Sequence, residues 1–157
     1  MQMAMSAMAA AFGDDVAVVD VGIAADVPGV GILDRKVRRG TGNIAVEDAM
    51  TRPEALAAMA AGMEQAARAR ADSITALGIG EMGIGNTSAA VLSVLTGSDI
   101  EAVTGRGGGL TDEGFARKKD VLRRALTRRA VDKDDVLDVL CAVGGLDIAA
   151  MAGAFLG

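Results

Sequence analysis

The sequence predicts an α/β fold in which a parallel sheet is flanked by helices, as a single domain over residues 1–157. A short apolar run at 16–21 has the composition of a strand buried on both faces. A long helical segment at 51–71 follows, and a second apolar run at 73–79 comes directly after it. Strand, long helix and strand in this order indicate a right-handed parallel crossover.

The composition also favours helices that pack closely on a sheet. Aromatic residues make up 2% of the 157 residues, and Trp and Tyr are absent. The interior must therefore be built from Ala, Val, Leu, Ile and Met. A chain of this length is expected to bury roughly 70% of its unfolded surface, which is enough for one core.

The N-terminal part predicts a helix, a strand and a long loop. Residues 3–12 have helix-forming composition, and the strand at 16–21 lies between Asp15 and Gly22. Residues 22–42 are rich in glycine and basic side chains and predict a loop. Loops of about twenty residues in a compact domain are usually functional.

The helix at 51–71 begins at a capping box formed by Thr51 and Glu54, with Pro53 in its first turn. Its apolar residues recur at three- and four-residue spacing, which predicts an amphipathic helix packed on the sheet. This predicted stripe consists of Leu56, Met59, Ala60, Met63, Ala67 and Ala71.

The C-terminal half predicts further helices. Small and aliphatic residues at 88–95 predict a short helix that ends at Gly97, and residues 102–104 predict a short third strand. Residues 113–129 predict a helix with a basic face. Two more helices are expected at 136–143, with Asp132 and Asp135 as caps, and at 146–156.

Composition excludes several classes of function. The net charge of −5 and the scarcity of aromatic rings argue against a nucleic-acid partner. The absence of His removes imidazole bases, Ser-His triads and the commonest zinc ligand. Cys141 lies in an apolar helical context and is expected to be an inert buried thiol in a reducing cytoplasm. No apolar run approaches the ~20 residues of a membrane span, so no membrane partner is expected.

The stretch most typical of a functional site is ALGIGEMGIGNTSAA at 76–90, a glycine-rich turn that holds one carboxylate. Gly78, Gly80 and Gly83 match a dinucleotide fingerprint, but Glu81 would repel the pyrophosphate. Residues 80–87 also match a triphosphate loop in which Asn86 replaces the essential lysine. Neither nucleotide class is therefore favoured.

Two interpretations of this stretch remain. Glycines allow close backbone approach, and the amides at Asn86, Thr87 and Ser88 could bind an anion at the start of a helix. The alternative is a tight strand-to-helix turn in which Thr87 is only a cap.

A second glycine cluster, GRGGGL at 105–110, precedes Lys118 and Lys119 and could form another wall of a phosphate site. The alternative is that these lysines belong to the solvated face of a basic helix. With a phosphate bound here, Glu81 would suit chemistry at a sugar whose anomeric carbon becomes positive.

The segment GEMGIGNT at 80–87 resembles the signature of the nicotinate-nucleotide:dimethylbenzimidazole phosphoribosyltransferases. Five further segments resemble that family in the same order along the chain. They are VVDVG at 18–22, GT-x-N at 40–43, EDAMT at 47–51, GRGGGLTDEG at 105–114 and GGLDIAAMAGAFLG at 144–157.

The resemblance implies a pentosyltransferase that moves phosphoribose from nicotinate mononucleotide to 5,6-dimethylbenzimidazole. The products would be nicotinate and α-ribazole 5′-phosphate, which serves the lower ligand of cobalamin. The resemblance further implies a Rossmann-like three-layer fold, incomplete here relative to the family. It also implies a cytoplasmic homodimer with neither cofactor nor metal.

The resemblance assigns roles to individual residues. Glu81 is the implied catalytic residue near the ribose, and Met82 borders the benzimidazole pocket. The residues implied to surround the 5′-phosphate are Gly83, Asn86, Thr87, Gly105, Gly107 and Lys118. Ser88 and Arg106 are further predicted substrate-binding residues.

The chain departs from the family pattern in three respects. A single Thr follows Asn86 where the family often has two, and Ser88 could serve in place of the second. Gly108 stands where the family usually has a threonine, and the glutamate regarded as general base lies beyond the point equivalent to Gly157. The alternative function is therefore a non-catalytic module, derived from that enzyme, that binds a nucleotide phosphate or dimerises.

Overall fold

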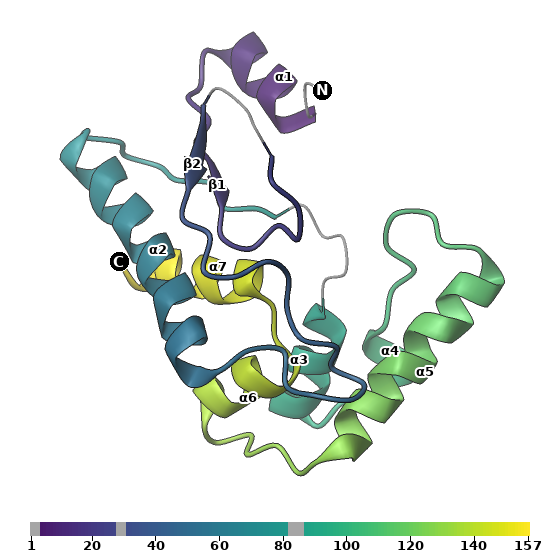
Figure 1. Cartoon of the computed structure of the whole chain (residues 1–157). Helices are drawn as coiled ribbons and strands as arrows, with labels where there is room; N and C mark the ends of the chain where they lie inside the picture. Colours follow the sequence, from purple (N-terminus) through teal and green to yellow (C-terminus); the bar gives the residue numbers. More distant parts are fainter. Residues whose placement is uncertain (1–3, 28–30, 82–86) are drawn as a thin grey trace.

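The computed structural model describes residues 4–27, 31–81 and 87–157 (Figure 1). Two strands and seven helices occur in these ranges, so the predicted α/β class is confirmed. In chain order they are α1 (Ala4–Phe12), β1 (Val18–Asp20), β2 (Ile32–Asp34), α2 (Arg52–Ala71), α3 (Ser88–Thr96), α4 (Ile100–Val103), α5 (Asp112–Arg128), α6 (Val136–Val143) and α7 (Leu146–Leu156).

The sheet is parallel as predicted, but its second strand is not the predicted one. β1 pairs with β2 in a register that sets Val18 opposite Ile32 and Asp20 opposite Asp34. β2 lies inside the region predicted as a loop, and the predicted strand at 73–79 is wrong because those residues pair with no strand among the described residues. β2 has only three residues, which is too short a run for an alternating pattern to be recognised.

The predicted strand at 102–104 is also wrong. Residues 100–103 form the single turn of α4, and the Asp99 carboxylate caps it by accepting the backbone N–H of Glu101 at 3.0 Å. This local cap stabilises a helical turn where the apolar residues alone suggest a strand.

The end of β1 is held by a largely buried ion pair. The Asp20 carboxylate accepts the backbone N–H groups of Gly22 at 3.0 Å and Ile23 at 2.9 Å. Lys36 Nζ donates to Asp20 Oδ2 at 2.6 Å and to the carbonyl oxygens of Ile23 and Ala25. Only 6% of the Asp20 side chain and 17% of the Lys36 side chain are exposed, so the pair fixes the loop that follows β1.

This ion pair predicts a loss of stability in acid. Burial raises the pKa of Asp20, but the hydrogen bonds and the charge of Lys36 outweigh it, and the pKa lies below its ordinary value. A lowered carboxyl pKa stabilises the fold above the unfolded pKa of ~4, and this stability is lost as the pH falls through the folded value. We expect the unfolding free energy in urea to fall below about pH 4, by roughly 1.4 kcal/mol for each unit by which the pKa is lowered.

The variant Asp20→Asn is the control for this prediction. It should be less stable than the parent at pH 7 and should show a shallower decline of the unfolding free energy in acid. Equal acid slopes for the two proteins would contradict the assignment of this stability to Asp20.

Helix α2 begins at the predicted capping box, since the Thr51 hydroxyl and the Glu54 carboxylate each accept the other residue's backbone N–H. Its buried face, however, is not the predicted stripe. Leu56 and Met63 are 50% and 43% exposed. The buried positions are Ala55, Ala58, Ala61 and Gly62.

The reason for this difference is the close approach of α7, which lies against α2 (Figure 1). A Cβ atom placed on Gly62 would lie 1.8 Å from the carbonyl oxygen of Ala150, and one on Gly153 would lie 1.9 Å from that of Met59. The two backbones are therefore in contact, and only small residues fit between the helices.

The rest of the core lies where α3, α5 and α6 meet the loop that precedes α2. Val139 and Val143 of α6 are fully buried, and Ile44 and Met50 of the loop pack with them. Cys141 is buried as predicted, and burial raises the pKa of its thiol.

A group of charges at the edge of the core joins the end of α5 to that loop and to α6. The Arg129 guanidinium bonds to Asp48 at 3.0 Å and to Asp138 at 2.8 Å, and Arg128 also pairs with Asp48. Burial raises the pKa of Asp48, but the hydrogen bonds from the two arginines outweigh it, and the pKa lies below its ordinary value. The hydrogen bond from Arg129 likewise lowers the pKa of Asp138. The network fixes where α5 ends and α6 begins.

Candidate functional site

The glycine-rich stretch at 76–90 leads into the N-terminus of α3, where the hydroxyl group of Thr87 lies. Thr87 precedes the first helical residue, Ser88, but its side chain does not cap the helix. Thr87 Oγ1 is buried and has no hydrogen-bond partner among the described residues. Thr87 therefore occupies the N-cap position of α3 without a side-chain capping hydrogen bond. A buried hydroxyl without a partner costs about 1–3 kcal/mol, so a hydrogen bond to a polar group at this position would be stabilising.

The carboxylate of this stretch, Glu81, lies at the end of the preceding described segment, and its side chain is exposed. Partial desolvation raises its pKa above the ordinary value, and the negative charge of Asp147 raises it further. Asp147 lies in the first turn of α7, after the buried pair Gly144 and Gly145. Met82, Gly83 and Asn86, which also belong to the predicted site, lie outside the described residues.

The second glycine cluster forms a turn between α4 and α5, and a lysine of α5 hydrogen-bonds to this turn. Gly107 and Gly109 adopt left-handed φ values of 67° and 87°, and Gly109 N donates to Gly107 O at 2.8 Å. Lys118 Nζ of α5 donates to the carbonyl oxygen of Gly105 at 2.9 Å. The ammonium group of Lys118 therefore lies at the turn.

Arg106, another predicted site residue, contacts two side chains that lie close to it in the sequence. Its guanidinium pairs with Asp112 at 2.5 Å and lies 5.0 Å from the centre of the Phe115 ring. Lys119 lies 4.5 Å from that ring centre and pairs with Glu101 at 2.8 Å. An anion at this turn would compete with Asp112 for Arg106.

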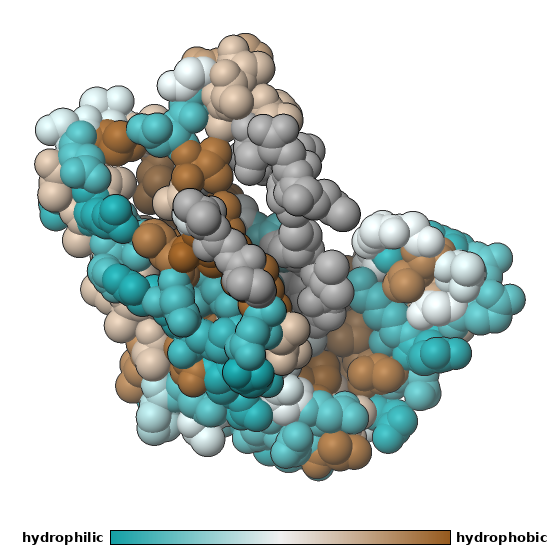
Figure 2. Space-filling model, turned by 45° about the horizontal axis from the view of Figure 1, so that its top comes forward, coloured by the Kyte–Doolittle hydropathy of each residue, from teal (hydrophilic) through white to brown (hydrophobic). Residues whose placement is uncertain are grey.

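The two glycine clusters are carried by helices that contact each other, since α3 packs against both α4 and α5. Figure 2 shows the lobe that carries the 105–109 turn at one side of the molecule, with a largely hydrophilic surface. In the described parts of the chain, no hydrogen bond joins Glu81 or Thr87 to the residues at 105–109.

Sequence reasoning did not identify Asp147 as a neighbour of Glu81. The two residues are far apart in the chain, and only the folded position of α7 brings their charges into interaction. The available signal was the motif GGLDIAAMAGAFLG, in which Asp147 is the one charged residue.

The described residues contain neither a metal-binding cluster nor a membrane-spanning helix. Within 4–27, 31–81 and 87–157, no three His, Cys, Asp or Glu side chains gather closely enough to hold a metal ion. In the same ranges, no helix combines the length and apolar character that crossing a membrane requires.

The parallel strands and flanking helices place the chain among the α/β proteins. A family model described as Phosphoribosyltransferase matches residues 1–157, and the chain belongs to this family.

Longer proteins are similar to the chain over nearly its whole length. It is 46% identical over 156 residues to a nicotinate-nucleotide–dimethylbenzimidazole phosphoribosyltransferase of Acetivibrio thermocellus, covering 98% of this chain and 44% of that protein. The enzyme of the same name from Clostridium acetobutylicum is 44% identical over 147 residues, which are 92% of this chain and 42% of that protein.

The fold comparison agrees with the sequence comparison. The crystal structure of CobT from Thermus thermophilus matches with a TM-score of 0.90 at 44% identity, covering 98% of this chain and 47% of that chain. The chain therefore spans less than half the length of these relatives.

Proposed function

We propose that residues 1–157 form the central portion of a phosphoribosyltransferase catalytic domain and contribute its phosphate-binding loops and Glu81. The reaction would transfer phosphoribose from nicotinate mononucleotide to 5,6-dimethylbenzimidazole and release nicotinate and α-ribazole 5′-phosphate. The observation that carries this proposal is the buried Thr87 hydroxyl, which has no partner among the described residues and lies at a helix start, at the end of the segment 80–87 that resembles the family signature.

Each group then has a chemical task. The first amides of α3 and the Thr87 hydroxyl would bind the 5′-phosphate, because helix N-termini favour anions. Lys118 would add a positive charge at the 105–109 turn. Glu81 would face the ribose and stabilise the positive charge that develops at its anomeric carbon as nicotinate leaves.

The proposal includes the setting of the enzyme. It would be a cytoplasmic homodimer acting in assembly of the lower ligand of cobalamin, without a cofactor and without a nucleic-acid or membrane partner. Met82 would border the benzimidazole pocket, and Gly83, Asn86, Ser88, Gly105, Arg106 and Gly107 would complete the phosphate site. The names of the relatives support the two substrates.

The test uses a full-length hybrid in which these 157 residues replace the matching region of the Acetivibrio thermocellus relative. We expect the hybrid to form α-ribazole 5′-phosphate from the two substrates, as measured by chromatography. The 157-residue chain alone should bind nicotinate mononucleotide in calorimetry. Binding by the chain without turnover by a folded hybrid would favour the non-catalytic module. No binding by either protein would exclude both the enzymatic function and a nucleotide-binding module.

The variant Thr87→Val makes a more specific prediction about the phosphate site. Valine keeps the shape and removes the unpaired hydroxyl, so we expect the unfolding free energy to rise by about 1 kcal/mol. Binding of nicotinate mononucleotide should weaken by about tenfold or more, because a hydrogen bond to a charged group is lost. Urea unfolding and calorimetry measure the two effects.

Thr96→Val, at the other end of α3, is the matched control. The Thr96 hydroxyl donates to the carbonyl oxygen of Leu92 at 2.7 Å, so its removal should lower stability slightly and leave binding unchanged. A Thr87→Val protein that is less stable and binds normally would refute the assigned role.

A further inference from the structure

The 105–109 turn carries an arginine whose charge is paired with a nearby carboxylate. Arg106 Nη2 donates to Asp112 Oδ1 at 2.5 Å, and Arg106 Nη1 donates to the carbonyl oxygen of Leu110 at 3.3 Å. Both charged side chains are exposed, Arg106 by 52% and Asp112 by 85%. An ion pair this exposed is weak, so a stronger acceptor can replace the carboxylate.

Asp112 is not the residue that caps α5. The N-cap is Thr111, whose hydroxyl accepts the backbone N–H of Gly114 at 3.2 Å. Glu113 supplies a second negative charge to the same first turn, where the helix dipole favours acidic side chains. The contact between Asp112 and Arg106 is therefore separate from the start of the helix.

The ring of Phe115 attracts the guanidinium independently of Asp112. Its centre lies 5.0 Å from Arg106 Cζ and 4.5 Å from Lys119 Nζ, which are distances at which a cation is attracted to an aromatic face. Arg106 can therefore release Asp112 and stay at the turn, over the ring. Lys118, whose ammonium donates to the neutral carbonyl oxygen of Gly105, lies at the same turn.

We propose that Asp112 competes with the phosphate group of the substrate for Arg106 and so sets the affinity of the 105–109 turn for that group. A phosphate monoester carries about −1.5 to −2 charges near pH 7 and three acceptor oxygens. It is therefore a stronger partner for the planar guanidinium than one carboxylate oxygen. This inference rests on the proposed function, because it requires the phosphate of nicotinate mononucleotide to lie at this turn.

The competition has a consequence for turnover. The phosphate group does not change in the proposed reaction, so substrate and product would both bind Arg106 through it. Removing Asp112 strengthens this binding in the ground state and the transition state alike. In the full-length hybrid, Asp112→Asn should therefore lower KM for nicotinate mononucleotide without raising kcat.

The test is a double-mutant cycle on Arg106 and Asp112, with binding of nicotinate mononucleotide to the 157-residue chain measured by calorimetry. Asp112→Asn should tighten binding by about three- to fivefold, the effect of releasing one exposed ion pair. Arg106→Gln should weaken binding by about tenfold. In the Arg106→Gln protein, Asp112→Asn should change Kd by less than about 1.5-fold, because the group it competes for is absent.

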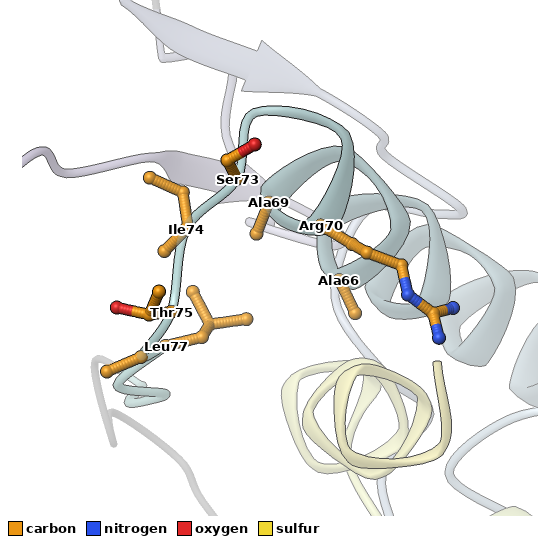
Figure 3. A pocket seen from close by; sticks show the side chains of 8 residues that line it. Ala66, Ala69, Arg70, Ser73, Ile74, Thr75 and Leu77 are labelled. Carbon is orange, nitrogen blue, oxygen red and sulfur yellow. The ribbon is translucent and has the colours of Figure 1, made fainter.

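Two control variants remove a charge without removing this contact. Glu113→Gln deletes the neighbouring carboxylate in the first turn of α5. Arg70→Gln deletes an exposed arginine at the C-terminal end of α2, beside an open groove that Ala66, Ala69 and Leu77 line (Figure 3). This groove and the 105–109 turn lie on opposite sides of the molecule (Figure 1). Each variant should leave Kd within about 1.5-fold of the parent value.

The possible results separate this inference from the proposed function. If the parent binds nicotinate mononucleotide and Asp112→Asn binds it no more tightly, the competition is refuted and the proposed function stands. Equal tightening by Glu113→Gln, or by Asp112→Asn in the Arg106→Gln protein, would assign the effect to general charge and would also refute the competition. If neither the chain nor the hybrid binds nicotinate mononucleotide or inorganic phosphate, the proposed function and this inference both fail.

Discussion

Replacing Gly153 by alanine is expected to lower the unfolding free energy by about 3 kcal/mol or more, although it adds a single methyl group to a helix. The new Cβ atom would lie 1.9 Å from the carbonyl oxygen of Met59 and 2.7 Å from its Cα atom, both in the backbone of α2. Backbone atoms cannot rotate away as a side chain can. The two helices must therefore separate, and the close packing between α2 and α7 is lost.

Gly114→Ala in α5 is the matched control, because it makes the same chemical change in a helix with space. There the nearest atoms to the new Cβ are Leu110 Cδ2 at 3.3 Å and Thr111 Oγ1 at 3.4 Å, both in exposed side chains. Helix propensity favours alanine over glycine by about 1 kcal/mol, so this variant should match or exceed the parent in stability. Urea unfolding of the three proteins measures the difference, and a Gly153→Ala protein as stable as Gly114→Ala would show that α2 and α7 do not touch.

The close contact of α2 and α7 also explains which parts of the fold the sequence could predict. The bounds of α6 and α7 agree with the prediction, and α2 begins at its predicted capping box, because helix ends depend on nearby residues. The prediction for the buried face of α2 is wrong because it places large apolar side chains inside. Which face is buried depends on α7, which is distant in the sequence and requires small residues at the contact.

Strands are predicted less well for a related reason. A strand is defined by its partner, and partners are distant in sequence. The run at 18–20 finds a partner in three residues that carry no strand pattern of their own. The run at 73–79 has the pattern but finds no partner among the described residues, so it is not a strand here.

Some features of the candidate site could likewise be predicted from neighbouring residues, while others depend on residues that are distant in the sequence. The glycines, Glu81 and Thr87 could be identified from one continuous motif. The interaction of Glu81 with Asp147 and the missing hydrogen-bond partner of Thr87 depend on how α7 and α3 are placed. Family resemblance supplied candidate roles for the residues, and the folded structure added the negative charge of Asp147, which acts on Glu81.

The pH dependence of the reaction tests whether the negative charge of Asp147 acts on Glu81. If the carboxylate form of Glu81 stabilises the developing positive charge, activity is lost as the pH falls through its pKa. Desolvation and the charge of Asp147 both raise this pKa, so the acidic limb of the profile should lie above the ordinary range of a glutamate. In the hybrid, Asp147→Asn should move the acidic limb of kcat to lower pH, and an unchanged limb would contradict the coupling.

The variant Glu81→Gln should have the largest effect on activity, lowering kcat of the hybrid by about 100- to 1,000-fold. Glutamine keeps the size of the side chain but removes the negative charge that would act on the ribose in the transition state. Because the phosphate is bound by other groups, KM for nicotinate mononucleotide should change less than about threefold. Glu113→Gln, which removes an exposed carboxylate from the first turn of α5, is the control and should leave kcat unchanged. A Glu81→Gln protein that retains more than about a tenth of the parent kcat would assign the stabilising charge to another residue, and the pH profile of Asp147→Asn would then show whether Asp147 supplies it.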